Sequence, residues 1–112
     1  MTENTGFQNR PIGRKQTLVS PIGLAGSTLG VSNPPEDVYI RGMEHGINLF
    51  LWDRSFKPMT NVLMNLPDNT RNKLFICVLI PFGGPKQIRK WVSKKLETLK
   101  LDKISCLMLK LG

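Results

Sequence analysis

The sequence predicts an α/β fold in which buried parallel strands alternate with helices. Three unbroken apolar runs of strand length lie at 47–52, 72–80 and 104–112. Unbroken runs are typical of strands that are covered on both faces. Segments with helical periodicity or helix-terminal residues precede or separate them, at 33–46, 58–66 and 84–100. Alternation of this kind favours a parallel sheet with connecting helices.

The N-terminal part is predicted to contain a tail, a hairpin and a first strand. Residues 1–9 are polar and lack an apolar core, so we expect a flexible tail and no secretory signal. After the tail, Gly13 and Pro21 interrupt two short apolar pieces, 17–19 and 22–25. We expect a small hairpin or an extended plug here, and then a first short core strand.

Two of the predicted helices have clear sequence markers. The segment 33–46 offers Asn33 as an N-cap, prolines in its first turn and Gly46 at its end. The segment 84–100 carries an apolar stripe with basic residues around it. The stripe consists of Ile88, Trp91, Val92, Leu96 and Leu99.

The net charge of +8 is unusual for 112 residues, and much of it lies at 86–103. Seven basic and two acidic residues give that segment a charge of +5. The plainer interpretation is the solvated face of one helix, and the alternative is a surface for nucleic acid or an acidic partner. Trp91 lies on the apolar stripe and not among the cations, which argues against nucleic acid. No apolar run is long enough to cross a membrane.

Cysteine and histidine usage predicts no metal site. Cys77 and Cys106 lie within apolar runs, which indicates buried reduced thiols in a cytoplasmic protein and not a disulfide. One histidine and two separated cysteines do not form a metal-ligand cluster. His45 falls in the last turn of a predicted helix, where a capping or surface role suits the helix dipole.

Four segments resemble aldo-keto reductases in the same order. They are "VSPIGLAG", "RGMEHGINLF", "TRNKLFICVLI" and "SKKLETLKLDKISCLMLK". The resemblance covers residues 10–112 and implies the N-terminal hairpin and first half of a TIM (β/α)8 barrel, with about four parallel strands. It therefore implies one domain, 10–112, after a tail at 1–9, and we expect a truncated barrel.

The resemblance implies a family activity, NAD(P)H-dependent carbonyl reduction, that this chain is not expected to perform. The family uses a Tyr as proton donor, a Lys and an Asp that tune it, and a His that orients the substrate. The matching positions are Leu51 for Asp, Phe56 for Tyr, Leu79 or its neighbour Ile80 for Lys, and Lys110 for His. We predict no catalytic residue, and "LFLWDRS" is similar to a divergent branch that lacks the standard tetrad.

The resemblance also bears on cofactor and partners. Only Ala25, Gly26 and Ser27 match a region that touches the nicotinamide side, and the family's other NADP(H)-binding residues lie in the C-terminal half. We therefore expect no cofactor on this chain. An uncovered half-barrel would expose apolar surface and strand edges, which predicts self-association or contact with a C-terminal half.

Three further features have competing interpretations. Trp52 is predicted to fill space at the strand end and not to stack on a ligand. Gly83 and Gly84 are predicted to form a strand-to-helix turn and not a phosphate loop. Lys110, at the end of a strand, is a candidate Schiff-base nucleophile, with an ordinary solvated lysine as the plainer interpretation.

Overall fold

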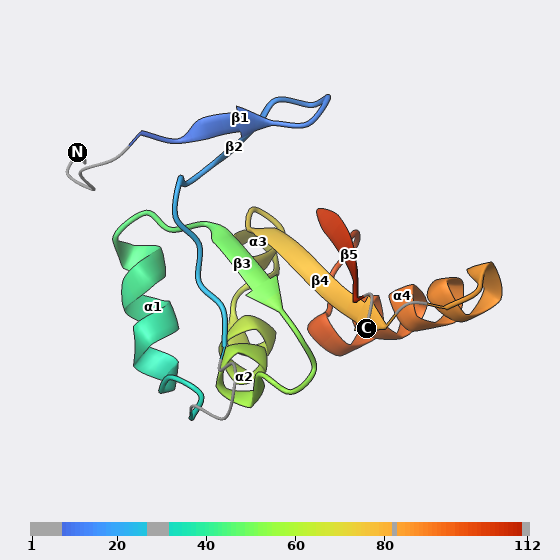
Figure 1. Cartoon of the computed structure of the whole chain (residues 1–112). Coiled ribbons are helices and arrows are strands. Elements are labelled where there is room, and N and C mark those ends of the chain that lie inside the picture. Colours follow the sequence, from blue (N-terminus) through green and yellow to red (C-terminus); the bar gives the residue numbers. More distant parts are fainter. Residues whose placement is uncertain (1–7, 27–31, 82, 111–112) are drawn as a thin grey trace.

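The computed structural model describes residues 8–26, 32–81 and 83–110 (Figure 1). Its centre is a parallel sheet of three strands in the order β3-β4-β5. These strands are β3 (Leu49–Trp52), β4 (Phe75–Pro81) and β5 (Cys106–Lys110). The intervening helices are α1 (Glu36–Glu44) before β3, α2 (Lys57–Asn65) and α3 (Asp68–Arg71) before β4, and α4 (Pro85–Leu99) before β5. The predicted α/β class is confirmed.

A hairpin precedes the sheet, as predicted. Strands β1 (Arg10–Ile12) and β2 (Thr17–Val19) pair antiparallel, and Gly13 takes a positive φ of 75° in the turn between them. Asn48 fixes this hairpin to the start of β3 by accepting a hydrogen bond from the Ser20 amide at 2.7 Å and donating one to the Leu18 carbonyl at 2.9 Å. Figure 1 shows the hairpin beyond the amino-terminal end of β3. The predicted tail at 1–9 lies almost entirely outside the described residues.

The predicted first core strand is reduced to a single bridge. Leu24 pairs in parallel with Phe50, with its amide donating to the Leu49 carbonyl at 3.0 Å and its carbonyl accepting from the Leu51 amide at 2.9 Å. A Cβ at Gly23 would lie 2.9 Å from the Leu49 carbonyl oxygen, so a glycine permits this close approach. The first of the four expected strand positions is therefore occupied, but by one bridge and not by a strand.

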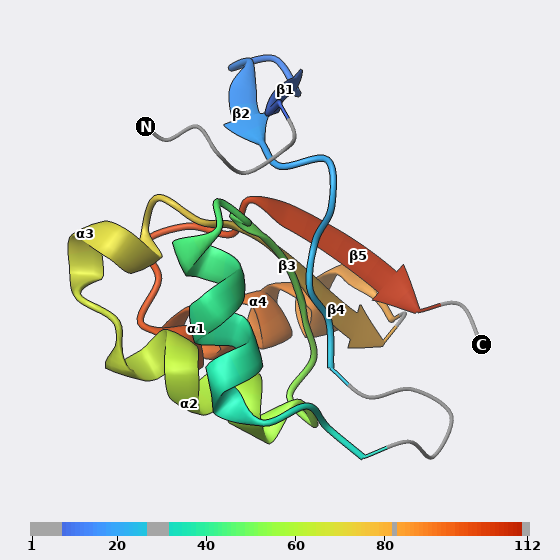
Figure 2. The ribbon, with the colours of Figure 1, turned by 90° about the vertical axis from the view of Figure 1, so that its left-hand side faces the viewer.

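Helices cover one face of the sheet. The side chains of Phe50, Trp52, Ile76, Val78 and Ile80 are 0–1% exposed. They share one core cluster with side chains from α1, α2 and α4, and Figure 2 shows α1 and α2 side by side. The alternate residues of β3 and β4 are only half-buried. The apolar runs predicted burial on both faces, and for the described residues that prediction is wrong because no second layer covers the other face.

Helix α1 begins later than predicted. Pro35 occupies the N-cap position and no side chain caps the helix, so the assignment of Asn33 as N-cap is wrong. Consecutive prolines explain the shift, because a residue that precedes proline is disfavoured in the helical conformation. Gly46 ends the segment with a φ of 96°, as predicted. His45 is the exposed C-cap residue and its ring Nδ1 lies 2.8 Å from the Arg41 carbonyl oxygen, in agreement with a capping role.

Arg71 is a buried cation that joins three helix ends. Its side chain is 1% exposed, and its guanidinium donates to the carbonyls of Leu63 at 3.2 Å, Leu66 at 2.8 Å and Lys100 at 3.1 Å. It also pairs with the exposed carboxylate of Asp68. Carbonyls that follow α2 and α4 are otherwise hard to satisfy, because the last turn of a helix leaves its acceptors unpaired. One planar fork of donors therefore fixes where α2, α3 and α4 end.

Replacement of Arg71 tests this role. We expect Arg71→Ala to lower the free energy of unfolding by about 3 kcal/mol or more, because it removes a buried side chain that donates to three carbonyls and leaves those of Leu66 and Lys100 without this donor. Arg89→Ala is the matched control, since Arg89 is exposed on α4, and a change of less than about 0.5 kcal/mol is expected there. Urea unfolding measures both. Equal effects of the two variants would contradict the assignment.

Candidate functional site

The carboxyl ends of β3 and β4 carry two of the four positions that the resemblance assigns to catalysis. Leu51 and Leu79 lie on adjacent strands and share the uncovered face of the sheet, since Leu51 pairs with Cys77 in the register. Ile80, the alternative position, is fully buried on the helix-covered face, so Leu79 is the position that shares a face with Leu51. Two aliphatic side chains therefore stand where the resemblance places an Asp and a Lys.

Phe56, the position that matches the family's Tyr, follows β3 in the chain and packs into the core. It is the N-cap residue of α2 and only 6% exposed. A Cβ at Gly26 would lie 2.3 Å from the Phe56 ring, so ring and backbone are in direct contact. The Ala25 carbonyl accepts a hydrogen bond from the Tyr39 hydroxyl at 3.0 Å. Of the three predicted cofactor-contacting residues, Ala25 and Gly26 are thus engaged in packing.

Two predicted site residues fall outside what the structure describes. Ser27 lies outside the described residues. Lys110 is the last residue of β5, and its side chain is not among those described. The Schiff-base hypothesis for Lys110 therefore stays a prediction.

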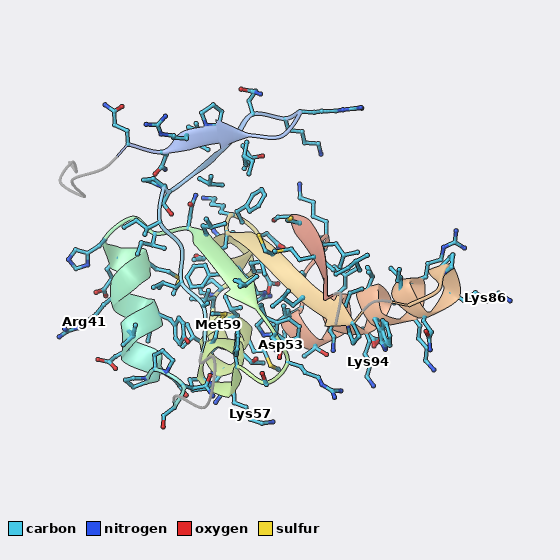
Figure 3. All side chains as sticks on the ribbon, viewed as in Figure 1. Arg41, Asp53, Lys57, Met59, Lys86 and Lys94 are labelled. Carbon is cyan, nitrogen blue, oxygen red and sulfur yellow. The ribbon has the colours of Figure 1, made fainter. Side chains whose placement is uncertain are left out.

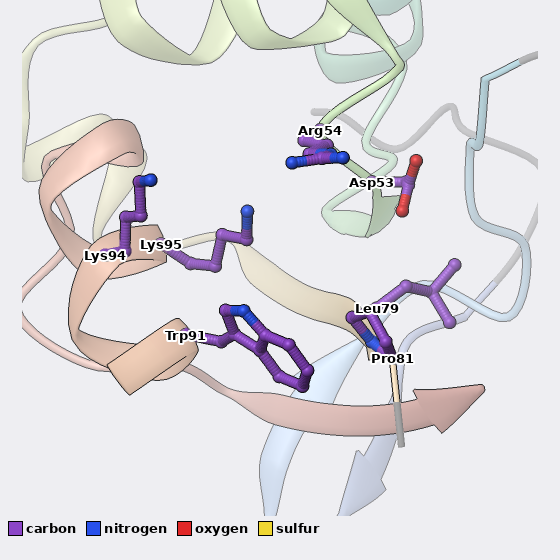
Figure 4. Close-up of a pocket in the computed structure, with 7 residues that line it drawn as sticks. All are labelled: Asp53, Arg54, Leu79, Pro81, Trp91, Lys94 and Lys95. Atoms are coloured by element: carbon purple, nitrogen blue, oxygen red, sulfur yellow. The ribbon is translucent and has the colours of Figure 1, made fainter. Parts of the chain in front are cut away.

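A cavity of about 410 Å³ opens beside the carboxyl end of β4 (Figure 4). It lies between the loop after β3, the end of β4 and the middle of α4. Its lining combines apolar and charged side chains: Asp53, Arg54, Leu79, Pro81, Trp91, Lys94 and Lys95. The cavity therefore adjoins Leu79, one of the four degenerate positions, while three cations and one acid define its charge.

Lys95 is the unexpected residue of this cavity. It is 9% exposed, and its Nζ lies 5.5 Å from the centroid of the Trp52 ring, a cation–π geometry. Burial lowers the pKa of the Lys95 amine, the positive charges of Arg54 and Lys94 lower it further, and Asp53 opposes them. A buried ammonium with two neighbouring cations is disfavoured relative to the free amine.

The spacing of residues in α4 predicts that Lys95 is buried, although its charge grouped it with the exposed basic residues. Lys95 follows Ile88 by seven positions, Trp91 by four and Val92 by three, and it precedes Leu99 by four. It therefore lies on the buried stripe of α4 by spacing alone. Three residues of the predicted stripe are confirmed, with Leu99 fully buried and Ile88 and Trp91 packed against the core, whereas Val92 and Leu96 are only half-buried.

Trp52 fills the core, as predicted. Its side chain is fully buried, and its indole Nε1 donates to the Thr60 hydroxyl at 2.8 Å. That hydroxyl in turn donates to the Phe56 carbonyl at 2.9 Å. Trp52 thereby links β3 to the first turn of α2. Its ring also makes the cation–π contact with Lys95.

Gly83 and Gly84 form the turn into α4. Gly84 is the N-cap residue of the helix, and a Cβ at Gly83 would approach the Gln87 side chain to 2.7 Å. The glycine therefore accommodates a close side chain, in agreement with a strand-to-helix turn.

The two cysteines are free and adjacent. Cys77 and Cys106 pair in register on neighbouring strands, and both are half-buried, not fully buried as predicted. The difference follows from their position on the uncovered face of the sheet. Burial raises the pKa of the Cys77 thiol to about 11, with the neighbouring Cys106 adding to the effect.

The remaining basic residues at 86–103 are exposed, which agrees with the predicted solvated face. They are Lys86, Arg89, Lys90, Lys94, Lys100 and Lys103. Within the described residues, no cluster of three or more potential ligands could hold a metal ion. In the same part of the chain, no helix is long and apolar enough to cross a membrane.

Comparison with known proteins identifies the fold. No family model matches the chain, and no curated protein matches it in sequence. A solved structure from Pseudomonas aeruginosa, described as a "putative aldo-keto reductase", superposes with a TM-score of 0.70 at 21% identity. The match covers 97% of this chain and 51% of that one, so this chain spans about half the length of its structural neighbour. The described residues therefore have the fold of half of such a TIM barrel.

The shifted pKa of Lys95 predicts a pH effect on stability. Its folded-state pKa lies below the unfolded value of 10.5, so the unfolded chain binds the extra proton and stability from this residue rises with pH. We expect the stability difference between the native chain and Lys95→Met to move in favour of the native chain from about pH 8 to about pH 10. Tyr39 and Cys77 have raised pKa values, so their contributions to stability change with pH in the opposite direction. These contributions are the same in the native chain and in the variant and therefore cancel in the difference.

Lys86→Met supplies the control, because Lys86 is exposed on the same helix. Thermal unfolding across this pH range measures all three proteins. A pH-independent difference between the native chain and Lys95→Met would show that Lys95 has an ordinary pKa.

Proposed function

We propose that this chain is an aldo-keto-reductase-like half-barrel that does not itself reduce carbonyl compounds. The observation that carries the proposal is the apolar character of the three positions: Leu51 and Leu79 share the uncovered face of the sheet, and Phe56 is buried in the core cluster. Carbonyl reduction requires a proton donor of tuned pKa, and general acid catalysis contributes about 10²–10⁴-fold. Neither a leucine nor a phenylalanine has a proton to donate.

The three substitutions are physically consistent with one another. An isolated carboxylate at position 51, with no cation at position 79, would be a partly buried unpaired charge, and a covering second layer would bury it further. Loss of one member of such a set therefore favours loss of the others. By this argument the chain belongs to a branch of reductase-like proteins that keeps the scaffold without the acid–base residues or a bound NADP(H).

We further propose that a second copy of this chain covers the open face of the sheet. The half-buried residues Leu49, Leu51, Cys77 and Leu79 form an apolar surface, and β5 is an edge strand within the described sheet. Leu107, Met108 and Leu109 on that edge are each about 40% exposed. The structural neighbour is about twice as long, so two copies have the number of residues that one barrel requires.

A two-fold axis along the barrel would preserve the parallel order of strands. It would place β5 of each copy beside the Leu24 segment of the other, which already bonds to β3 as a parallel bridge. An isologous arrangement of this kind is the commonest symmetry of protein dimers. We also propose a cytoplasmic location for this protein, because Cys77 and Cys106 are free thiols.

A basic interaction module is the second candidate function. The observation that favours it is the set of six exposed cations along and after α4, none of which forms an ion pair with another described residue. An acidic partner or nucleic acid would bind this surface with a steep salt dependence. Binding that persists unchanged from about 50 mM to about 200 mM salt would exclude this candidate.

The loss of reductase chemistry is tested by cofactor oxidation. We expect the purified chain to show no NADPH oxidation with 4-nitrobenzaldehyde above a protein-free control, because no proton donor is present at the strand ends. Phe56→Tyr should not restore turnover, since no lysine or aspartate tunes the added hydroxyl. Turnover that disappears when Phe56 or Leu79 is replaced would overturn the proposal.

Dimer formation is tested by replacing an edge residue. We expect Met108→Asp to convert a dimer to a monomer in sedimentation velocity, because a charge on β5 opposes edge pairing. Val38→Asp is the matched control: Val38 is 38% exposed on α1 and Met108 is 42% exposed. The native chain and the control should sediment at twice the mass of 12.6 kDa. A monomeric native chain at tens of micromolar would contradict the second-copy proposal, as would an unaffected Met108→Asp dimer.

A further inference from the structure

We propose that the cavity beside α4 binds a small organic phosphate, with the phosphoryl group held by Arg54, Lys94 and Lys95. This inference concerns the cavity beside the carboxyl end of β4, and it does not depend on the proposed loss of reductase chemistry. It follows from the charge balance of the cavity, from its size and from the nature of its walls.

The charge balance of the cavity is incomplete without an anion. Three cations and Asp53 line it, which leaves a net charge of +2. Asp53 already accepts hydrogen bonds from the Ser55 amide at 3.1 Å and from the Ser55 hydroxyl at 2.5 Å. Its carboxylate therefore serves the turn after β3 as well as the cavity. A phosphate monoester carries a charge of about −1.5 to −2 at pH 7, which matches the surplus.

Lys95 distinguishes this cavity from a group of surface lysines, because it is buried. The residue is 9% exposed and its Nζ lies over the Trp52 ring, so the side chain is held in place and partly desolvated. Figure 4 shows the Lys95 and Arg54 side chains extending into the same space from α4 and from the loop after β3. Charge-assisted hydrogen bonds strengthen in a site of low dielectric. The guanidinium of Arg54 adds a fork of donors that suits phosphate oxygens.

The walls indicate that the ligand is organic. A volume of about 410 Å³ exceeds what a bare phosphate ion fills, and it lies in the range of small-molecule sites. Trp91, Leu79 and Pro81 supply the apolar part of the lining. An aromatic or aliphatic body attached to the phosphate would lie against these side chains. We therefore infer a phosphate monoester with an apolar body as the ligand class.

Titration with three probes tests the proposal at constant ionic strength. Phenyl phosphate should bind with saturation in isothermal titration calorimetry, inorganic phosphate should bind about 10-fold more weakly, and phenol should show no binding. Phenyl phosphate should also shift the indole N–H resonance of Trp91 in NMR spectra. Absence of saturation by phenyl phosphate up to about 10 mM would overturn the proposal.

Charge-matched variants separate the cavity from the basic surface. Lys95→Met should weaken phenyl phosphate binding by about 10-fold or more, because it removes a charge-assisted hydrogen bond. Lys86→Met removes the same charge from the exposed far end of α4, which Figure 3 shows well away from Lys94, and it should change affinity by less than about 2-fold. Equal losses in the two variants would indicate nonspecific attraction and overturn the site assignment.

Arg54→Gln provides an independent variant on an exposed side chain. Arg54 lies on the loop after β3 and outside the helix layer, so its replacement leaves the core intact. We expect a loss of affinity for phenyl phosphate comparable to that of Lys95→Met. Affinity retained in Arg54→Gln would contradict the proposed phosphoryl contact even if Lys95→Met failed to fold.

Discussion

The structure depends on a sheet that helices cover on one face only. Phe50, Trp52, Ile76, Val78 and Ile80 point into the helix layer and are almost inaccessible to water. The residues between them are also apolar, yet they stay half-buried because nothing in the described chain lies over them. Strands of a TIM barrel are buried on both sides, by helices outside and by other strands inside. The first of these layers is present here, and the second requires another half-barrel.

This constraint also explains the chemistry of the strand ends. Leu51 and Leu79 place no unpaired charge on the half-buried open face, and Phe56 places none in the core. Charge is instead gathered beside α4, where Arg54, Lys94 and Lys95 line one cavity. Leu79 lies on the open face and also lines this cavity, so the apolar face and the cationic cavity adjoin at the carboxyl end of β4.

Sequence patterns predicted the order of the longer elements, the hairpin, the α/β class and the buried position of Trp52, since these follow from local apolar periodicity and turn residues, but they did not predict the short helix α3. They did not predict the single bridge at Leu24, which depends on the approach of Gly23 to β3. Residue type concealed the burial of Lys95 and Arg71, because lysine and arginine are rarely buried, and Trp52, over which the Lys95 amine lies, is distant in sequence. The degenerate positions could be named from the resemblance, but their shared face required the strand register.

Hydrogen exchange along the sheet tests the half-barrel account most directly. Amide protection of β4, an internal strand, should be independent of protein concentration, because its partners belong to the same chain. Protection of β5 should rise with concentration, because a second copy would pair its free edge. Strong protection of β5 at the lowest concentration, equal to that of β4, would contradict the account by showing that the chain covers its own edge.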